Sequence, residues 1–346
     1  MDTPLLKKLK KLWNSKSPFV FFRLPKSKKS TVYFQKNNKL HITDNLNCSG
    51  FLMAPFDIKN QIPFIPEEFS ENYELNRTKV LDQIKSELVL DSKNKDSFKN
   101  LVEKAKKNIK SGKIKKVVVS QTQKVVSRRN IISIFQDLLY NYPLAMVYLW
   151  HHPSIGTWFG ASPEQFIKTK GDISQTMALA GTQIFDKNKP TSWSNKEVEE
   201  QELVAIQVEK DLKVLFPNKQ IQKSSVFNHR AGNLVHLCTY FRFPKLKGNL
   251  FEVAQGLHPT PAVGGVPKKE AQKFIFTNES YDRSFYTGFL GPTSKLETQL
   301  FVNLRCASWT PKITTIYVGA GITLNSNAEK EWFETQRKAK TILKVL

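Results

Sequence analysis

Cysteine is scarce in this sequence of 346 residues, and its three cysteines, Cys48, Cys238 and Cys306, lie far apart. Their spacing excludes a C-x-x-C metal clamp, and their number is too small for the disulfide framework of a secreted domain. No apolar run reaches the roughly 18 to 20 residues of a membrane helix, and the opening MDTPLLKKLKKLWNSKS lacks the apolar core of a signal peptide. We therefore expect a cytoplasmic protein without stable membrane insertion.

Acidic side chains are also few. The chain has 30 aspartates and glutamates and 53 lysines and arginines, which gives a net charge of +23 with histidine neutral. Such an excess favours anionic partners, which include nucleic acid, anionic membrane surfaces and acidic small molecules. The basic residues are spread through lysine-rich loops, and no RRM, KH, helix-turn-helix or zinc-finger pattern accompanies them. Nucleic-acid binding therefore stays open as an alternative, but we expect no nucleic-acid partner.

Apolar residues are abundant: 40% of the chain is hydrophobic, including 24 phenylalanines, which is enough for a large core and excludes a disordered or fibrous protein. Strand-like and helix-like segments come in groups, which favours an α+β arrangement of antiparallel sheets over a doubly wound parallel sheet. Strands are predicted at 18–24, 30–35, 50–56, 115–126, 145–151, 157–169, 234–241, 299–309 and 314–324. Helices are predicted at 76–111 in two parts, 131–141, 195–215, 267–277 and 327–344.

The chain shows no Gly/Ser linker, low-complexity tract or tandem repeat. We therefore expect one domain over residues 1–346, with an N-terminal subregion at 1–111 and a motif-bearing core at 112–346. Near the start, leucines at helical spacing between lysines predict a lysine-coated helix docked on the surface, with contact to anionic lipid as the alternative.

The few acidic residues cluster in two predicted helices, in KEVEEQELV (196–204) and EKEWFETQRK (329–338). Residues three apart share a helix face, which makes two carboxylate pairs, Glu197 with Glu200 and Glu331 with Glu334. If the helices face each other, the carboxylates need a cation between them, and oxygen ligands from few side chains suit Mg²⁺. The alternative is that these are solvated helix faces with local ion pairs and capping boxes.

Other residue types in the chain suit an anionic ligand. GAGI (319–322) ends a predicted strand, where glycine lets a ligand approach backbone amides. Arg305 lies in the middle of the predicted strand FVNLRCASW, and its planar fork suits a bidentate carboxylate from the protein or from a ligand. Lys116 precedes three valines, so it points either inward from the strand or into solvent at its edge.

Three further features decide nothing alone. Glu164 in GASPEQF fits a turn, and His236 in NLVHLCTYF fits a core histidine. HPTPAVGGVPK (258–268) predicts a rigid loop and not a phosphate loop, because the GxxxxGK[ST] pattern is absent.

Taken together and in order, nine segments resemble the chorismate-utilising enzymes, and most closely the isochorismate synthases of the menaquinone and siderophore type. They are KKVVVSQ, FGASPEQF, ALAGT, KEVEEQELV, NLVHLCTYF, HPTPAVGGVPK, FYTGFLG, FVNLRCASW and GAGITLNSNAEKEWFET. The resemblance implies one large α+β domain of two packed antiparallel β-sheets with helices outside and a central site. It also implies a monomer or a loose homodimer.

The resemblance further implies a role for each position. Lys116 matches the lysine that activates water, and Glu164 matches the general acid. Glu200 and Glu334 match direct Mg²⁺ ligands, with Glu197 and Glu331 beside the metal. The groups that match the substrate site are Thr182, His236, Tyr286, Arg305, Lys338 and the amides around Gly319, Ala320 and Gly321.

The implied reaction is the Mg²⁺-dependent conversion of chorismate to isochorismate, in which water attacks C2 and the C4 hydroxyl leaves. Lys116 must then be neutral, so its pKa has to lie well below its usual value, while Glu164 must keep its proton through a raised pKa. Anthranilate synthases lack a lysine at the Lys116 position. Enzymes that go on to eliminate pyruvate often carry threonine at the position of Ala262.

Salicylate synthase, aminodeoxychorismate synthase and a pseudoenzyme that only binds chorismate remain alternatives. The sequence also departs from the family pattern at two positions. Gln121 stands where an arginine is frequent, and Gln201 stands where a histidine often follows the metal glutamate. The menaquinone and siderophore pathways both stay open as destinations of the product.

Overall fold

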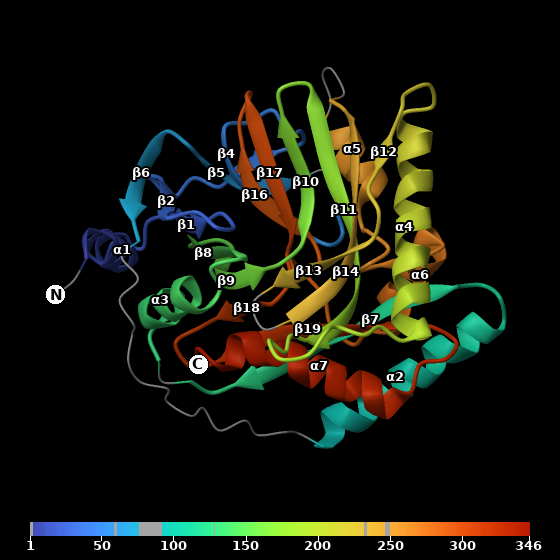
Figure 1. The fold of residues 1–346 in the computed structure, drawn as a ribbon. Helices are drawn as coiled ribbons and strands as arrows, with labels where there is room; N and C mark the ends of the chain where they lie inside the picture. Colours follow the sequence, from blue (N-terminus) through green and yellow to red (C-terminus); the bar gives the residue numbers. More distant parts are fainter. Residues whose placement is uncertain (1–2, 59–60, 76–91, 128, 232–233, 246–249) are drawn as a thin grey trace.

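A computed structural model describes the chain except for residues 1–2, 59–60, 76–91, 128, 232–233 and 246–249 (Figure 1). The described residues form two sheets in which every strand pairing is antiparallel. In spatial order the first sheet holds β15 (Gly265–Val266), β7 (Lys116–Val125), β19 (Thr314–Ile322), β18 (Cys306–Trp309), β9 (Gly156–Ser162), β8 (Met146–His152), β1 (Phe19–Arg23), β2 (Lys29–Phe34) and β6 (Phe69–Glu74).

The second sheet lies beside the first. In spatial order it holds β12 (Gln222–Lys223), β14 (Leu234–Pro244), β11 (Ile173–Ile184), β10 (Gln165–Lys170), β17 (Glu297–Val302), β16 (Phe289–Thr293), β4 (Gly50–Ala54), β5 (Ile62–Pro66) and β3 (His41–Thr43), with β13 (Phe227–Ala231) also paired to β14. An aromatic layer that includes Phe22, Phe51 and Trp150 fills the space between the sheets.

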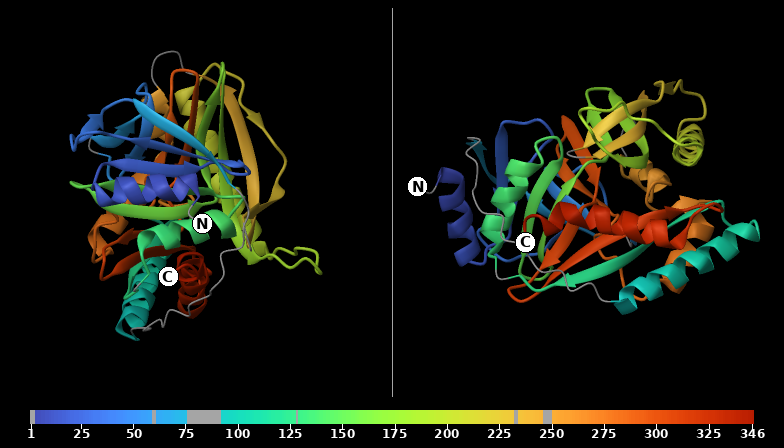
Figure 2. Two further views of the ribbon diagram at one scale, coloured as in Figure 1. Left: turned by 90° about the vertical axis from the view of Figure 1, so that its left-hand side faces the viewer. Right: turned by 60° about the horizontal axis from the view of Figure 1, so that its bottom comes forward.

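Helices cover the outer faces of both sheets (Figures 1 and 2). On the first sheet, α1 (Pro4–Asn14) and α3 (Ile131–Asn141) lie at one end, and α2 (Ser92–Lys110), α6 (Lys268–Asn278) and α7 (Ala328–Leu343) lie against β7 and β19. On the second sheet, α4 (Asn195–Leu215) packs on β11 and β14, and α5 (Leu250–Leu257) packs on α4. The predicted α+β class, with two antiparallel sheets and helices outside, is confirmed.

The lysine-coated helix near the start is docked as predicted, because Leu5, Leu6, Leu9 and Leu12 of α1 are buried against the protein. Within the described part of the chain, no helix is both long and apolar enough to cross a bilayer. The first of the two helices predicted within 76–111 falls largely outside the described residues.

Two long strands predicted from the sequence are each divided in the structure. The segment 157–169 is divided at Pro163 and Glu164 into β9 of the first sheet and β10 of the second. The segment 299–309 is divided at 303–305 into β17 and β18, so the prediction that Arg305 lies in the middle of a strand is wrong. Proline has no amide to donate, and Arg305 adopts a left-handed conformation with φ 48°, so neither residue continues a ladder.

The two crossings lie side by side. Ala161 N donates to Arg305 O at 3.0 Å, and Val302 N donates to Glu164 O at 3.0 Å. A paired ribbon therefore passes from one sheet to the other, and the turn in each of its strands carries one of the predicted site residues.

Candidate active site

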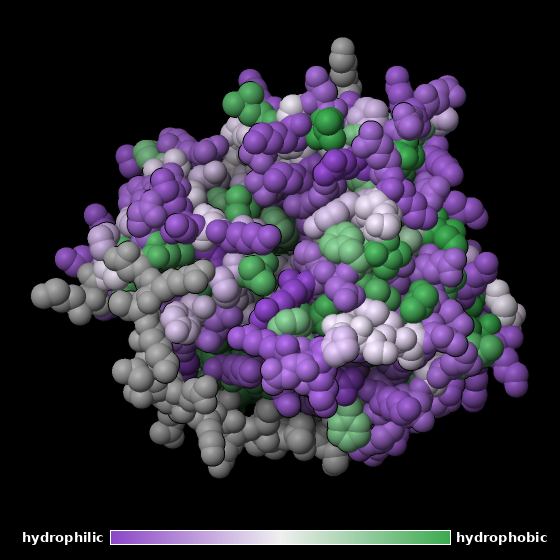
Figure 3. All heavy atoms as spheres, in the orientation of Figure 1, coloured by the Kyte–Doolittle hydropathy of each residue, from purple (hydrophilic) through white to green (hydrophobic). Residues whose placement is uncertain are grey.

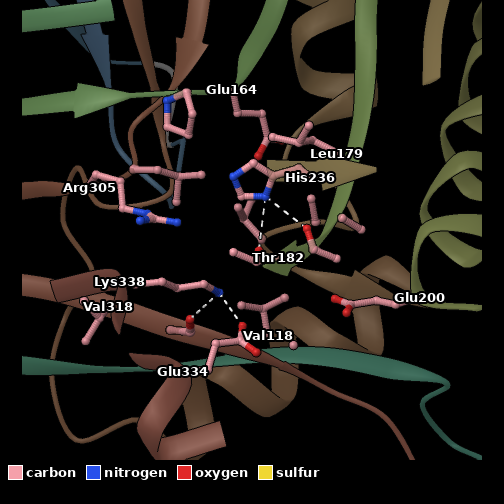
Figure 4. A pocket seen from close by; sticks show the side chains of 18 of the residues that line it. Val118, Glu164, Leu179, Thr182, Glu200, His236, Arg305, Val318, Glu334 and Lys338 are labelled. Atoms are coloured by element: carbon pink, nitrogen blue, oxygen red, sulfur yellow. Dashed lines mark hydrogen bonds and ion pairs between the residues drawn. The ribbon is translucent and has the colours of Figure 1, made fainter. Parts of the chain in front are cut away.

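A cavity lies where this ribbon changes sheets, and its volume is about 890 Å³ including the open mouth. Its walls come from β7 and β19 of the first sheet, β11 and β14 of the second, the N-terminal part of α4 and the middle of α7. The predicted site residues that line it are Glu164, Thr182, Glu197, Glu200, His236, Ala262, Tyr286, Arg305, Gly319, Gly321, Glu334 and Lys338 (Figure 4). Segments far apart in the sequence thus meet at one cavity.

Three predicted residues do not line this cavity. Lys116 lies directly behind Glu200, and Glu331 is turned toward Lys196. Ala320 is fully buried on the opposite face of β19, in the apolar cluster with Ala271 and Trp332. Its side chain therefore faces the helix layer, whereas its strand neighbours Gly319 and Gly321 border the cavity.

Glu164 is buried in the turn between β9 and β10, with 3% of its surface exposed. Burial raises its pKa to about 8, although the charges of Lys116 and Lys338 oppose the shift. A carboxyl group in this setting keeps its proton near neutral pH and can donate it to a ligand. The raised pKa that the acid role requires is thus present.

Lys116 extends from β7 into the interior and is fully buried. Its Nζ lies 2.9 Å from Glu200 Oε1, an ion pair that lacks hydrogen-bond geometry. Gly321 makes room for this pair, because a Cβ at that position would lie 2.7 Å from Glu200 Oε1 and 3.1 Å from Lys116 Cε. A larger residue at Gly321 would therefore displace the Glu200 carboxylate from this pair.

The loop 258–268 holds the strand that carries Lys116. Val118 N donates to Gly264 O at 2.8 Å, and Gly265 pairs with Val117 across β15 and β7. A Cβ at Gly265 would lie 2.3 Å from Lys116 O, so only glycine allows this contact. The loop acts as the close-approach element that its prolines and glycines predict.

The carboxylates of α7 each contact a lysine. Lys338 Nζ lies 2.7 Å from Glu334 Oε1 and also donates to Gly319 O at 2.9 Å. Burial opposes ionisation of Glu334, but the Lys338 ammonium keeps the pKa of this carboxyl below its usual value. Lys196 of α4 reaches across to Glu331 of α7 at 2.7 Å, so the two helices are in contact.

These residues allow a test of how well the protein fits Mg²⁺. Among the described residues, no three histidine, cysteine or acidic side chains converge on one point. Glu200 and Glu334 border the same cavity from two helices, and Mg²⁺ commonly binds through one or two carboxylates while it keeps waters and takes substrate oxygens. Glu197 instead caps α4, because its Oε2 accepts from Ser194 N at 2.9 Å. The donor set therefore fits Mg²⁺ through two carboxylates.

Arg305 points into the cavity from the opposite wall (Figure 4). Its guanidinium donates to Thr341 Oγ1 at 3.2 Å, and no carboxylate of the described residues lies within ion-pair distance. Burial lowers the pKa of this group, but an arginine stays charged at neutral pH. Of the two partners that the sequence leaves open for Arg305, a ligand carboxylate fits this geometry better than a protein carboxylate.

His236 lies on β14 beside Arg305 and is buried, and burial and the Arg305 charge lower its pKa to about 3. The ring is therefore neutral, and its Nδ1 lies 3.0 Å from Gly181 O and 3.1 Å from Thr182 Oγ1. A carbonyl oxygen can only accept, so Nδ1 carries the proton, and Nε2 is left as an acceptor without a hydrogen-bond partner in the described part of the chain.

Sequence reasoning missed part of the lining. The additional residues are Val118, Pro163, Leu179, Ala180, Gly181, Lys196, Val263, Leu304, Tyr317 and Val318. Most are apolar side chains of strands, which no local pattern separates from ordinary core residues. Lys196 could have been found from the sequence, because it is the first residue and the sole basic residue of the acidic segment KEVEEQ.

Residues 17–346 match the family described as "Chorismate binding enzyme". Isochorismate synthase MenF of Haemophilus influenzae is 26% identical over 262 residues, which cover 71% of this chain and 59% of that protein. Isochorismate synthase DhbC of Bacillus subtilis is 27% identical and covers 72% and 68%. Anthranilate synthase component 1 of Saccharolobus solfataricus is also 27% identical, over 73% and 62%. The chain thus spans about three fifths of the length of the first and third of these relatives.

Solved structures show the same fold. The 2,3-dihydroxybenzoate-specific isochorismate synthase DhbC from Bacillus anthracis superposes with a TM-score of 0.81 at 23% identity, over 98% of this chain and 99% of that one. The menaquinone-specific isochorismate synthase MenF from Escherichia coli gives 0.80 at 20% identity, over 95% and 88%. At this level of identity the likeness establishes the architecture.

Proposed function

Because the chain belongs to the chorismate-binding enzyme family, we propose that it is an isochorismate synthase, an isomerase that converts chorismate to isochorismate. The observation that carries the proposal is the cavity itself. It is lined by a buried acid with a pKa of about 8 and by an arginine without a carboxylate partner among the described residues, and a fully buried lysine pairs with Glu200 of its wall. These are the groups needed to hold a dicarboxylate, to move its hydroxyl group and to activate water.

Each of these residues has a defined task in the reaction. Arg305 binds one substrate carboxylate, bidentately because its fork is planar. Glu164 donates its proton to the hydroxyl that leaves C4, and Lys116, once neutral, removes a proton from the water that attacks C2. His236 offers Nε2 as an acceptor beside the ring. Glu200 and Glu334 would hold Mg²⁺, which supplies a Lewis acid for the ring carboxylate when bound.

Anthranilate synthase is the second candidate, because one such relative is 27% identical. That reaction uses ammonia as its nucleophile, and its enzymes are expected to lack a lysine at the position of Lys116. Here Lys116 is present, fully buried and paired with Glu200, which lines the cavity. A lysine at this position supports water as the nucleophile and so favours the isomerase.

The test is incubation of the protein with chorismate and Mg²⁺, followed by chromatographic separation of isochorismate, salicylate, anthranilate and pyruvate. We expect isochorismate without pyruvate, no turnover in EDTA, and no anthranilate when ammonium is added. Salicylate with pyruvate would identify a salicylate synthase. Binding of chorismate without product would identify a pseudoenzyme, and salt-sensitive RNA affinity without turnover would favour a nucleic-acid binder.

A further inference from the structure

Two buried glutamines hold the two carboxylate-bearing helices against different sheets. Gln201 directly follows Glu200 on α4 and donates from Nε2 to Thr239 Oγ1 of β14 at 2.8 Å. Gln121 of β7 donates from Nε2 to Thr335 Oγ1 at 2.8 Å, and Thr335 directly follows Glu334 on α7. Each contact therefore acts on the residue next to one of the two glutamates that border the cavity.

Gln201 is the single polar residue in the buried stripe of α4, whose other members are Val204, Ala205, Val208 and Leu212. It is 3% exposed, and its partner Thr239 is fully buried. An amide at such a position destabilises the fold unless it is hydrogen-bonded, so placements of α4 that break its bond to Thr239 are disfavoured. The bond therefore ties the first turns of α4 to β14.

Gln121 plays the same part on the other side. It is 8% exposed, its bond to Thr335 fixes α7 relative to β7, and its Oε1 has no partner. Because α4 packs on the second sheet and α7 on the first, any ion shared by Glu200 and Glu334 lies across the boundary between the sheets (Figure 1). The relative placement of the two helices then sets how well both carboxylates reach the ion.

We propose that Gln121 and Gln201 are positioning residues for the divalent-metal site, which they support by locking α7 and α4 to their own sheets. This inference rests on the proposed function, because it assumes that Glu200 and Glu334 hold the metal. Both residues are also neutral amides, so neither adds a positive charge next to a carboxylate that has to bind a cation.

The test is the affinity for Mn²⁺ in the absence of chorismate, measured by calorimetry and by the EPR signal of the free ion. Gln201→Met and Gln121→Met keep the side-chain shape and remove the hydrogen bond. Each is expected to lower the Mn²⁺ affinity about tenfold, the usual effect of losing a residue that orients a metal ligand. The two contacts lie on different sheets, so the double variant should have an Mn²⁺ affinity about a hundredfold lower. Gln207→Met is the matched control, because Gln207 lies on α4 but bonds within the helix to Asp211, and it should stay within about twofold.

Two further measurements separate positioning from general stability. Thermal unfolding without metal reports folding, and Gln121→Met removes a buried oxygen that lacks a partner, so this variant should fold well. Thr335→Val removes the acceptor of the Gln121 bond together with the bonds of Thr335 Oγ1 to Trp332 O and Gln336 Nε2, so it should weaken Mn²⁺ binding at least as much as Gln121→Met does. Adding Gln121→Met to Thr335→Val should change the affinity little further. Equal Mn²⁺ affinities for the unaltered protein and the two glutamine-to-methionine variants would overturn this inference and leave the proposed function standing. Absence of Mn²⁺ binding by the unaltered protein would overturn the metal site of the proposed function, and this inference with it.

Discussion

The two sides of the cavity differ in how their charges are balanced. On the α4 and α7 side three glutamates contact lysines, in the pairs Lys116 with Glu200, Lys196 with Glu331 and Lys338 with Glu334, whereas Glu197 caps α4. On the opposite side, Glu164, His236 and Arg305 form no ion pair with the described residues. We call these the paired side and the unpaired side.

The difference shows which side awaits a ligand charge. Among the described residues, Thr341 is the one side chain to which the Arg305 guanidinium donates, so this group gains most from an incoming carboxylate. The buried carboxyl group of Glu164 lacks an ion-pair partner among the same residues and stays protonated. The paired side is already neutralised by ammonium groups, so a metal ion there has to compete with them. Hydrophilic residues cover most of the molecular face shown in Figure 3, in keeping with the strongly basic composition. The unpaired side is thus the more specific indicator of an anionic substrate.

The largest expected effect comes from removing the buried lysine of the paired side. Lys116→Ala should lower turnover about 10³-fold, because the water loses its base, while folding is retained. The measurement is isochorismate formation by chromatography, with circular dichroism as the check on folding. Lys115→Ala, one residue earlier and exposed, is the matched control and should behave like the unaltered protein. Full activity of Lys116→Ala would remove this residue as the base.

On the unpaired side, Glu164→Gln should lower kcat about 10²-fold and change KM little, because glutamine keeps the shape of the acid but cannot transfer its proton. Steady-state kinetics with chorismate measure both constants. A loss that appeared only in KM would show that Glu164 binds the substrate without acting as an acid.

Arg305→Lys keeps the charge of the unpaired side but loses the planar fork. We expect KM for chorismate to rise about tenfold, with a smaller change in kcat. Arg242→Lys, at an exposed position of β14, is the control and should leave both constants unchanged. An unchanged KM in Arg305→Lys would mean that the guanidinium does not grip a substrate carboxylate.

The smallest expected effect is a pH dependence. Glu164 has to be protonated to act as an acid, and its pKa is about 8. We therefore expect kcat/KM to decline as the pH rises above that value, which forms the alkaline limb of the pH profile. Titration of Glu164 should not change kcat/KM below that pH. A pH series between about 6 and 10 measures the decline. The residual activity of Glu164→Gln should lack this limb, and a limb that persists there has to come from another group.

Local patterns predicted much of the fold and the site. Helical spacing and capping residues gave α3, α4 and α7 nearly to their ends, and the order of the motifs indicated the residues that now border one cavity. Patterns missed the long strand β11, the helix α5 and the polar strand β6 (FSENYE), and they failed where a run changes sheets, as at Pro163 and Arg305. A period of two residues continues through such a crossing, so the sequence alone does not show that the two halves pair with different neighbours.

The sequence by itself determined the class of the fold, the two carboxylate-bearing helices and the residue types that the chemistry needs, because propensity, periodicity and motif order are local properties. Only the tertiary structure decided which charges are paired, that Lys196 joins the site, and that Ala320 and Glu331 face away from the cavity. Those facts depend on contacts between residues far apart in the chain. The burial that raises the pKa of Glu164 likewise exists only once the two sheets have packed.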